Sequence, residues 1–343
     1  MIRKTAKRFS DQIMRKLLGR VLQSGPDLMT TTSTFKSEAD RSLARRRWLS
    51  RWSDPDDTTL AVMLLAPAAI LLSVMIVYPV SRLIYTSFLD LSLTSGLPAR
   101  FAGLANFRQM PDDPVFWQAT WNTVLITLIT VPGSLFVGFA LALLANLPFR
   151  MKWPVRLSLL IPWALPLSFA GLIFGWFFHS EYGVVNDVLN RIGLPSVIWF
   201  NSPRLAFAAI CLAIIWKASS FMAMIILAGL QTIPRSLYEA ADVDGAGRVR
   251  QFLEITLPLL KPTIVVALIF RTITALQTFD IPYMMTGGGP GTETTTLAMY
   301  IHQNTVSFLD LGYGSALAVV MFGLSMLVTA LYLRMIRGNE AAS

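Results

Sequence analysis

Arg271, Thr274 and Thr278 are residues whose types and spacing could do chemistry. They lie three and four positions apart in an apolar run at about 263–285, so a helix would place all three on one face, with Gln277 beside them. A guanidinium, two hydroxyls and an amide can exchange hydrogen bonds with a polyol such as a sugar. The alternative is that the same groups hydrogen-bond neighbouring helices.

A second apolar run, at about 205–230, carries Lys217 and Ser220 between the aromatic residues Trp216 and Phe221. Charges inside a membrane span are costly and usually face a polar cavity. These four residues and the polar face described above therefore predict a hydrophilic pathway with aromatic walls. For the two cations the alternative is snorkelling to the membrane surface.

Between these two runs lies a polar stretch, residues 231–262, that is rich in charges and helix-ending residues. Ser236 and Glu239 form a capping-box pattern, which predicts the start of a short helix, and Gly245 is placed to end it in the left-handed conformation. A second helix from about Arg248 is expected to stop near Pro258. The resulting helix-turn-helix suits insertion into a groove on a partner, although it could instead pack on the span ends. Its tip comprises Glu239, Ala240, Ala241, Asp244, Gly245 and Ala246.

The glycine-rich run from Thr286 to Gly291 first suggests a phosphate-binding loop. The Gly-Lys-Ser/Thr that such a loop requires does not follow, and no strand is expected before it, so we interpret it as a turn. The single cysteine, Cys211, and the distant His179 and His302 show no metal-ligand spacing. We therefore expect no cofactor on this chain, no metal site and no enzymatic activity. Nucleotide energy would have to come from another subunit.

The elements that must position these residues are membrane-spanning helices. The chain is 54% hydrophobic and only 14% charged, which indicates a multi-span membrane protein. Backbone groups in hydrocarbon must be satisfied internally, so each span should be an α-helix. Prolines within the spans imply kinks. Six spans are expected, at about 60–84, 122–147, 157–178, 205–230, 263–285 and 315–336.

The distribution of positive charge predicts the orientation. If both termini are cytoplasmic, the cytoplasmic segments hold 22 Lys and Arg residues and the external loops hold 4. Without residues 1–59 the ratio is still 9 to 4. Excess positive charge marks the cytoplasmic side, so the stretch 231–262 should face the cytoplasm. The same distribution argues against nucleic-acid binding, despite a net charge of +9.

Residues 1–59 are polar and basic. Phe9, Ile13, Leu17 and Val21 recur every four residues opposite Lys and Arg, which favours an amphipathic helix on an anionic lipid surface. A partly disordered basic tail is the alternative. The expected organisation is thus a basic segment (1–59), a six-helix domain (60–337) and a short tail (338–343).

Several motifs resemble those of known transporters. The stretch from Glu239 to Ala246 is similar to the EAA signature of ATP-binding-cassette (ABC) importer permeases, of the carbohydrate-uptake branch that includes maltose and trehalose permeases. The matching positions are Gly229-Leu230-Gln231-x-Ile233-Pro234, Glu239-Ala240-Ala241-x-x-Asp244-Gly245-Ala246, Phe252, Ile255, Leu257-Pro258 and Pro262. Further matches are Phe101-x-Gly103-Leu104-x-Asn106-Phe107, Asp113-Pro114-x-Phe116-Trp117-x-Ala119-x-x-Asn122-Thr123, Arg271-Thr272, Phe279-Asp280 and the turn from Thr286 to Pro290.

The resemblance implies an all-α protein of type I ABC importer permease (MetI-like) architecture, with six transmembrane helices and both termini inside. It would lie in the bacterial inner membrane as half of a heterodimer with a second permease. Two copies of a cytoplasmic ATPase, which hold ATP and Mg, would dock on the stretch from Glu239 to Ala246. An external solute-binding protein would deliver a sugar or oligosaccharide of the maltose, trehalose or α-glucoside type.

Two other functions stay open. The same architecture could carry a non-sugar solute such as a glycerol phosphate diester. A secondary transporter is the more distant alternative, and it predicts inverted repeats with broken helices.

Overall fold

The computed structural model describes residues 57–147 and 152–340. These residues are mostly helical, and they include a two-residue antiparallel pairing of β1 (Leu89–Asp90) with β2 (Arg100–Phe101). Five of the described helices are long and apolar enough to cross a membrane, and a bent pair makes a sixth span. The predicted six-helix class is therefore confirmed. The N-terminal amphipathic helix lies outside the described residues.

The chain divides into two compact units, residues 1–78 and residues 79–343. The described part of the first unit is helix α3 (Asp57–Leu72) followed by a π-helical turn (Ser73–Val77). Its large apolar side chains are exposed, as expected for a helix whose surroundings are lipid rather than protein. The helix continues into α4 (Tyr78–Ser87), which completes a 30-residue apolar span.

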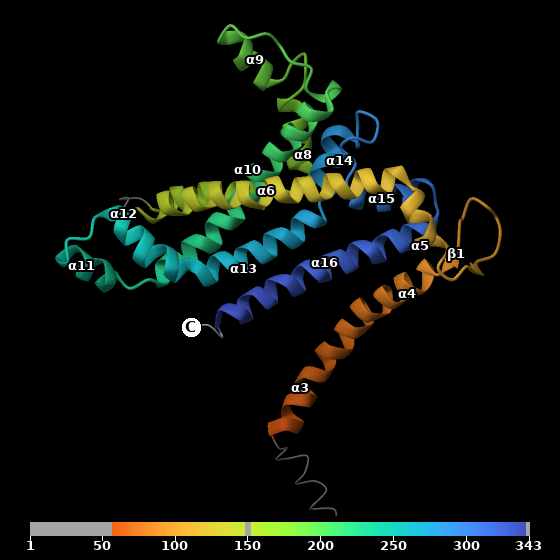
Figure 1. Cartoon of the computed structure of the whole chain (residues 1–343), viewed down its shortest axis with the longest axis horizontal. Helices are drawn as coiled ribbons and strands as arrows, with labels where there is room; N and C mark the ends of the chain where they lie inside the picture. Colours follow the sequence, from red (N-terminus) through yellow and green to blue (C-terminus); the bar gives the residue numbers. More distant parts are fainter. Residues whose placement is uncertain (1–56, 148–151, 341–343) are drawn as a thin grey trace, which may run out of the picture. The chain divides into compact units, whose positions relative to one another are not determined.

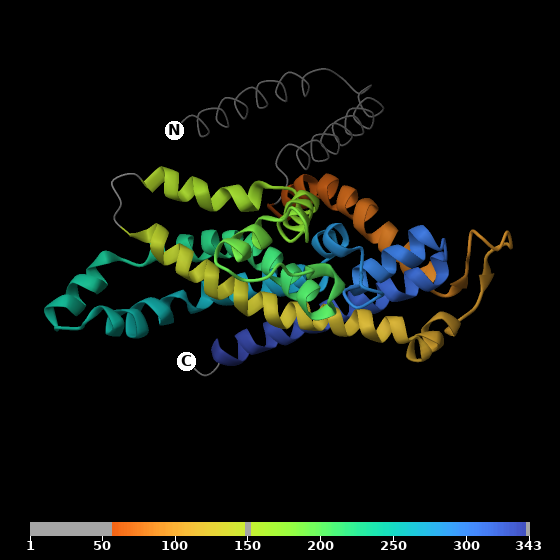
Figure 2. The same ribbon diagram turned by 90° about the horizontal axis from the view of Figure 1, so that it is seen from above.

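The second unit is built on four long helices that run side by side in Figures 1 and 2. Gly138 of α6 shows how closely α6 and α10 approach, because a Cβ there would lie 2.6 Å from the Cβ of Met222 and 2.8 Å from the carbonyl of Ser219. The four helices are α6 (Pro114–Asn146), α10 (Pro203–Thr232), α13 (Leu257–Leu276) and α16 (Leu311–Glu340).

The third predicted span is broken rather than continuous. It consists of α7 (Lys152–Ala164) and α8 (Leu167–Phe177), which meet at an angle of 94°. Pro166 occupies the N-cap position of α8, and its ring removes a donor at the break. A kink was predicted here, but the sequence did not indicate a right-angle bend. Beyond α8 lie α9 (Val184–Arg191) and a short 3-10 turn (Trp199–Asn201).

The polar stretch after α10 forms the predicted helix-turn-helix, with two corrections. Helix α11 (Arg235–Val243) begins after Pro234, and the Ser236 side chain makes no capping hydrogen bond, so the capping-box prediction is wrong. The second helix does not stop at Pro258. It runs from α12 (Arg248–Gln251) through a π turn (Phe252–Thr256) into α13, where Pro258 lies in the first turn and Pro262 lies inside the helix.

The helix of the fifth span ends earlier than predicted. Helix α13 ends at Leu276, and α14 (Asp280–Thr286) follows after a three-residue break. The glycine-rich segment then forms the predicted turn, closed by a 2.7 Å hydrogen bond between the hydroxyls of Thr286 and Thr294. Helix α15 (Leu297–His302) and a π turn (Gln303–Ser307) lead into α16.

Asp113 ties together the end of the unit opposite α11. It caps α6 through its Oδ1, which accepts from the backbone N–H groups of Val115 and Phe116. Its Oδ2 accepts from the hydroxyls of Tyr300, on α15, and Tyr313, on α16. The remaining elements at this end are α5 (Ala105–Gln109) and a 3-10 turn (Met110–Asp112).

Candidate functional site

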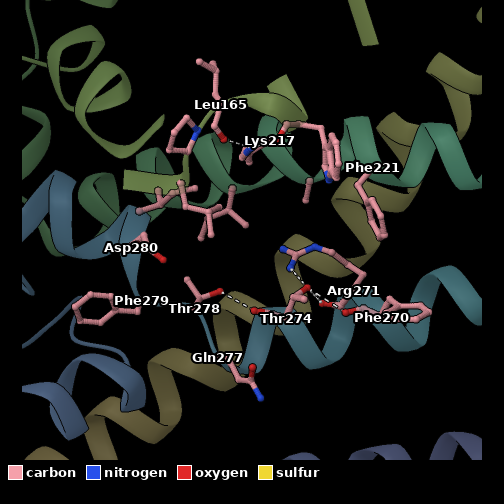
Figure 3. A pocket seen from close by; sticks show the side chains of 16 residues that line it. Leu165, Lys217, Phe221, Phe270, Arg271, Thr274, Gln277, Thr278, Phe279 and Asp280 are labelled. Atoms are coloured by element: carbon pink, nitrogen blue, oxygen red, sulfur yellow. Dashed lines mark hydrogen bonds between the residues drawn. The ribbon is translucent and has the colours of Figure 1, made fainter. Parts of the chain in front are cut away.

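A cavity of about 530 Å³ lies where the break between α7 and α8 faces α10, α13 and the start of α14. The chain brings polar and aromatic side chains to it from segments more than 100 residues apart (Figure 3). Its charged lining residues are Lys217, Arg271 and Asp280, so the lining carries one net positive charge. The other lining residues are Trp163, Leu165, Pro166, Leu167, Ile214, Ala218, Phe221, Phe270, Thr274, Gln277, Thr278, Phe279 and Ile281.

Arg271 is 95% buried, yet it is held only by neutral groups. Its Nε donates to Ser134 Oγ at 3.1 Å and its Nη2 donates to Thr130 Oγ1 at 2.7 Å, both on α6. A long contact of 3.5 Å joins its Nη1 to Thr274 Oγ1. Neither of the two ion pairs found within residues 57–147 and 152–340 includes Arg271. Burial of a charge without a counter-ion is costly, which makes this guanidinium the most unusual electrostatic feature of the cavity.

Lys217 has a different environment. Its Nζ donates to the backbone carbonyls of Pro162, Trp163 and Leu165, at 2.6, 2.7 and 2.5 Å. These carbonyls belong to the last turn of α7 and to the break that follows, where a helix leaves its final acceptors unpaired. An ammonium group has three donors, so all of them are used. Lys217 therefore stabilises the break in the third span.

The hydroxyls on α13 are oriented by the backbone. Thr274 donates to the carbonyl of Phe270 or Arg271, and Thr278 donates to that of Thr274. With their protons committed, these oxygens can still accept a hydrogen bond from a ligand hydroxyl. Asp280 supplies a further acceptor at the other side of the cavity, where Ser168 donates to its Oδ1 at 2.9 Å.

The structure brings together six of the eight residues predicted for the hydrophilic pathway. Figure 3 shows Arg271 directed into the space between α10 and α13, whereas Gln277 points away from it. Two predicted residues do not line the cavity. Trp216 packs against Phe174 of α8, with ring centroids 5.2 Å apart, and Ser220 is buried in α10. The six that line it are Lys217, Phe221, Arg271, Thr274, Gln277 and Thr278.

Sequence reasoning missed the wall formed by the break itself, from Trp163 to Leu167. The closely spaced Pro162 and Pro166 were the signal that could have indicated it, because two prolines in one apolar run disrupt consecutive turns. Asp280 belongs to the matched motif Phe279-Asp280, but it was not predicted for the site. Its position depends on the break that starts α14 and could not be read from a continuous helix.

The α11–α12 loop forms a second candidate site at one end of the helices (Figure 1). Gly245 has a φ of +74°, and the amide of Ala246 bonds the carbonyl of Ala241 at 2.8 Å, so α11 ends in the predicted left-handed cap. Glu239, Ala240 and Asp244 are exposed, and Val243 is 89% exposed. The loop is anchored from behind by Tyr238, whose hydroxyl contacts Thr256 Oγ1 at 2.8 Å.

Neither site has the composition of a metal centre. Within the described ranges, no group of three or more His, Cys, Asp or Glu side chains lies close enough to hold a metal ion. The chemistry available at the cavity is hydrogen bonding, charge and aromatic contact. The chemistry available at the loop is that of a small, partly apolar surface flanked by carboxylates.

Comparison with known proteins gives concordant matches. Residues 134–338 match the family model described as binding-protein-dependent transport system inner membrane component. The sulfoquinovosyl glycerol transport system permease protein SmoG of Agrobacterium fabrum is 81% identical over 294 residues, which cover 86% of this chain and 95% of that protein. The trehalose/maltose transport system permease protein MalF of Thermococcus litoralis is 37% identical over 279 residues, covering 81% and 94%.

A solved structure shares the fold. The crystal structure of a bacterial alginate ABC transporter, in complex with an alginate pentasaccharide-bound periplasmic protein, contains a chain that matches with a TM-score of 0.72. The match covers 83% of this chain and 96% of that one, at 23% identity. At this identity the likeness is evidence for the arrangement of the helices and not for the ligand.

Proposed function

This chain belongs to the family of binding-protein-dependent transport system inner membrane components, and we propose that it admits sulfoquinovosyl glycerol, or a closely similar anionic glycoside, to the bacterial cytoplasm. It is a multi-pass carbohydrate-uptake permease of the inner membrane. The observation that carries the choice of substrate is the 81% identity to the sulfoquinovosyl glycerol permease. The net positive cavity is consistent with it, because a sulfonate is anionic.

A neutral α-glucoside of the maltose or trehalose type is the second candidate substrate. It is favoured by the 37% identical trehalose/maltose permease. The buried Arg271 argues against it, since a neutral sugar would leave the guanidinium without a counter-ion.

The proposed energy source is a separate ATPase that holds ATP and Mg, with this chain acting as a permease and not as an enzyme. The exposed tip of the α11–α12 loop would enter a cleft on that ATPase. A second permease, a second ATPase copy and a solute-binding protein would complete the transporter. The packing of the loop supports this proposal. Its tip is exposed, while Tyr238 and Ile255 pack against the buried cluster around Leu230 and Leu260. A displacement of the tip would therefore be transmitted to the helices.

Uptake into proteoliposomes that contain the purified transporter tests the substrate and the energy source together. We expect sulfoquinovosyl glycerol to accumulate only with internal ATP and external binding protein, and an ionophore to have no effect. Accumulation of maltose or of a glycerol phosphate diester in its place would overturn the substrate. Uptake that survives without ATP and collapses with the ionophore would overturn the ABC mechanism.

Two glycines in the loop provide a matched test of coupling. Gly245 has a φ of +74° and Gly247 has a φ of −67°, and a Cβ would meet nothing within 4 Å at either position. Only Gly245→Val forces a side chain into the left-handed region, at a cost of about 1–2 kcal/mol. We expect Gly245→Val to insert normally but to lower uptake several-fold, and Gly247→Val to leave it near normal.

Glu239→Lys, which reverses a charge at the proposed docking surface, should behave like Gly245→Val. In both variants the membrane content of the permease, measured by immunoblot, should equal that of the unmodified chain. Normal uptake by Glu239→Lys and Gly245→Val would show that the loop does not couple this protein to its ATPase.

A further inference from the structure

Arg271 and Lys217 line the same cavity, but the geometry points to different roles. We propose that Arg271 binds the anionic group of the transported glycoside, whereas Lys217 holds the broken span and does not contact the substrate. This inference rests on the proposed function, because it assumes that the cavity is the substrate site. It assigns recognition of the sulfonate to one side chain.

The guanidinium of Arg271 has capacity for an anion. Three of its five N–H groups meet hydroxyl oxygens, one of them at the 3.5 Å limit, within the described part of the chain. All three partners are neutral, so no described residue compensates the positive charge through an ion pair. Asp280 lines the same cavity but forms no ion pair with Arg271 among the described residues. A bound anion would supply the missing charge.

The geometry of the Arg271 guanidinium matches that of a sulfonate. A guanidinium presents its donors in a rigid plane and binds tetrahedral oxyanions through two parallel hydrogen bonds. The hydroxyls of Thr130 and Ser134 fix the Nη2 and Nε sides of that plane from α6. The preorganised fork therefore loses little side-chain entropy when the ligand arrives.

Lys217 lacks this capacity. Its three donors are taken up by the carbonyls of Pro162, Trp163 and Leu165. Binding a sulfonate would break those hydrogen bonds and leave acceptors unpaired at the break in the third span. Of the two cations that line the cavity, only Arg271 thus has donors for an anion.

The remaining polar groups orient the rest of the ligand. Thr274, Thr278 and Asp280 offer oxygens that accept hydrogen bonds from sugar hydroxyls. With the sulfonate at Arg271, the ring and the glycerol hydroxyls would extend towards Thr278 and Asp280 (Figure 3). Phe221 and Phe270 flank the Arg271 side of the cavity. This places the anion at the α6 side of the site.

The proposal can be tested by a binding assay that does not depend on transport, in which a bound sugar protects a single cysteine from alkylation. Ala218→Cys, at a small lining residue to which no hydrogen bond with the ligand is assigned, is introduced in a Cys211→Ala background, which removes the only native thiol. Alkylation by a maleimide is then timed on the complete transporter in nanodiscs. The probes are sulfoquinovosyl glycerol and glucosyl glycerol, its neutral analogue in which a hydroxyl replaces the sulfonate.

We expect Arg271→Gln to raise the half-protecting concentration of sulfoquinovosyl glycerol about tenfold or more, because a charge-assisted contact is lost. Protection by glucosyl glycerol should change less than twofold. Arg271→Lys should recover part of the effect, since it keeps the charge. Arg204→Gln, at an exposed position, is the control for loss of one positive charge. In this variant both sugars should protect the cysteine at their usual concentrations.

Three results would overturn the proposal. Equal loss of protection by both sugars would mean that Arg271 only braces α6 against α13. Unchanged protection by the sulfonated sugar would mean that the anion binds elsewhere. Absence of protection by either sugar in the Ala218→Cys protein would mean that the cavity is not the site. In each case uptake of sulfoquinovosyl glycerol by the unmodified transporter decides independently whether the proposed function stands.

Discussion

Asp113 is a single carboxylate that joins three helices. Partial burial acts to raise its pKa, but hydrogen bonds from Tyr300, Tyr313 and two backbone amides outweigh this effect and hold the pKa below its ordinary value. The opposite shift occurs in Tyr300, whose burial and proximity to Asp113 raise the pKa of its hydroxyl to about 12. The network therefore stabilises the ionised form of the Asp113 carboxyl and the neutral form of the Tyr300 hydroxyl.

These shifts predict a pH dependence at acid pH. A carboxyl group whose pKa is lowered in the folded state contributes stability above its unfolded pKa, about 3.9, and this contribution is lost as the pH falls through the folded value. Asp113→Asn should therefore lower the melting temperature at pH 7 by roughly 3–6 °C. The difference from the unmodified protein should shrink below about pH 4.

Asp112→Asn is the control, because Asp112 is a neighbouring, exposed residue and its substitution removes the same charge. Its melting temperature should match that of the unmodified protein at both pH values. Thermal unfolding in detergent, followed by intrinsic fluorescence, measures both variants. A gap between Asp113→Asn and the unmodified protein that is as large at pH 3 as at pH 7 would contradict the role given to the charge.

Single residues were predictable where local geometry suffices. Arg271, Thr274 and Thr278 reach the cavity together because α13 is regular around them and the helical repeat fixes their common face. The partners of Lys217 were not predictable, since they lie 52–55 residues away in the sequence and become acceptors only because the third span breaks. The position of Trp216 outside the cavity was not predictable for a related reason, as its contact with Phe174 depends on the direction of α8.

At the scale of elements, the break between α7 and α8 is the feature that makes the cavity. Its last helical carbonyls would be unpaired without Lys217. We expect Lys217→Met to lower the melting temperature by about 5 °C, because buried acceptors lose charge-assisted hydrogen bonds. Hydrogen exchange should accelerate at residues 161–168, and more there than in α13.

Lys261→Met removes the same kind of side chain from an exposed position of α13 and should leave both measurements unchanged. The comparison separates loss of the cap from loss of a positive charge. If Lys217→Met melts and exchanges like the unmodified protein, the break is maintained by other contacts.

The elements show where proline rules succeed and where they fail. Pro234 ends α10 as the sequence predicts, but Pro258 does not end the following helix. The helix also continues past Pro262. A π turn from Phe252 to Thr256 precedes Pro258, and Phe252 makes an edge contact with Phe139 of α6, a long-range contact that the sequence pattern does not indicate. The 94° bend at Pro166 is the converse case, since a proline allows a bend but packing sets its angle.

At the scale of the whole molecule, the family and the number of spans followed from sequence because hydropathy and a long motif are strong signals. The orientation rests on charge alone and stays a prediction. We expect a membrane-impermeant maleimide added outside intact cells to label Thr292→Cys but not Val243→Cys, both in a Cys211→Ala background.

Both positions are exposed in the structure. The cells express the permease without its ATPase, which would otherwise cover the loop, so failure to react reports the side of the membrane and not burial. After the cells are opened, Val243→Cys should react as fast as Thr292→Cys. Labelling of Val243→Cys in intact cells would reverse the orientation and would remove the α11–α12 loop from the reach of any cytoplasmic ATPase.

The uninterrupted helix from Arg248 to Leu276 has a mechanical consequence. Arg248 adjoins the tip of the loop, and Arg271 lies 23 residues further along the same rod, a distance of about 35 Å at 1.5 Å per residue. A tilt of about 5° around one end of such a lever displaces the other by about 3 Å, the length of one hydrogen bond. Ligand contact at Arg271 and force at the tip would thus act on opposite ends of one helix, which contains the π turn and Pro262 as two places where a helix can bend.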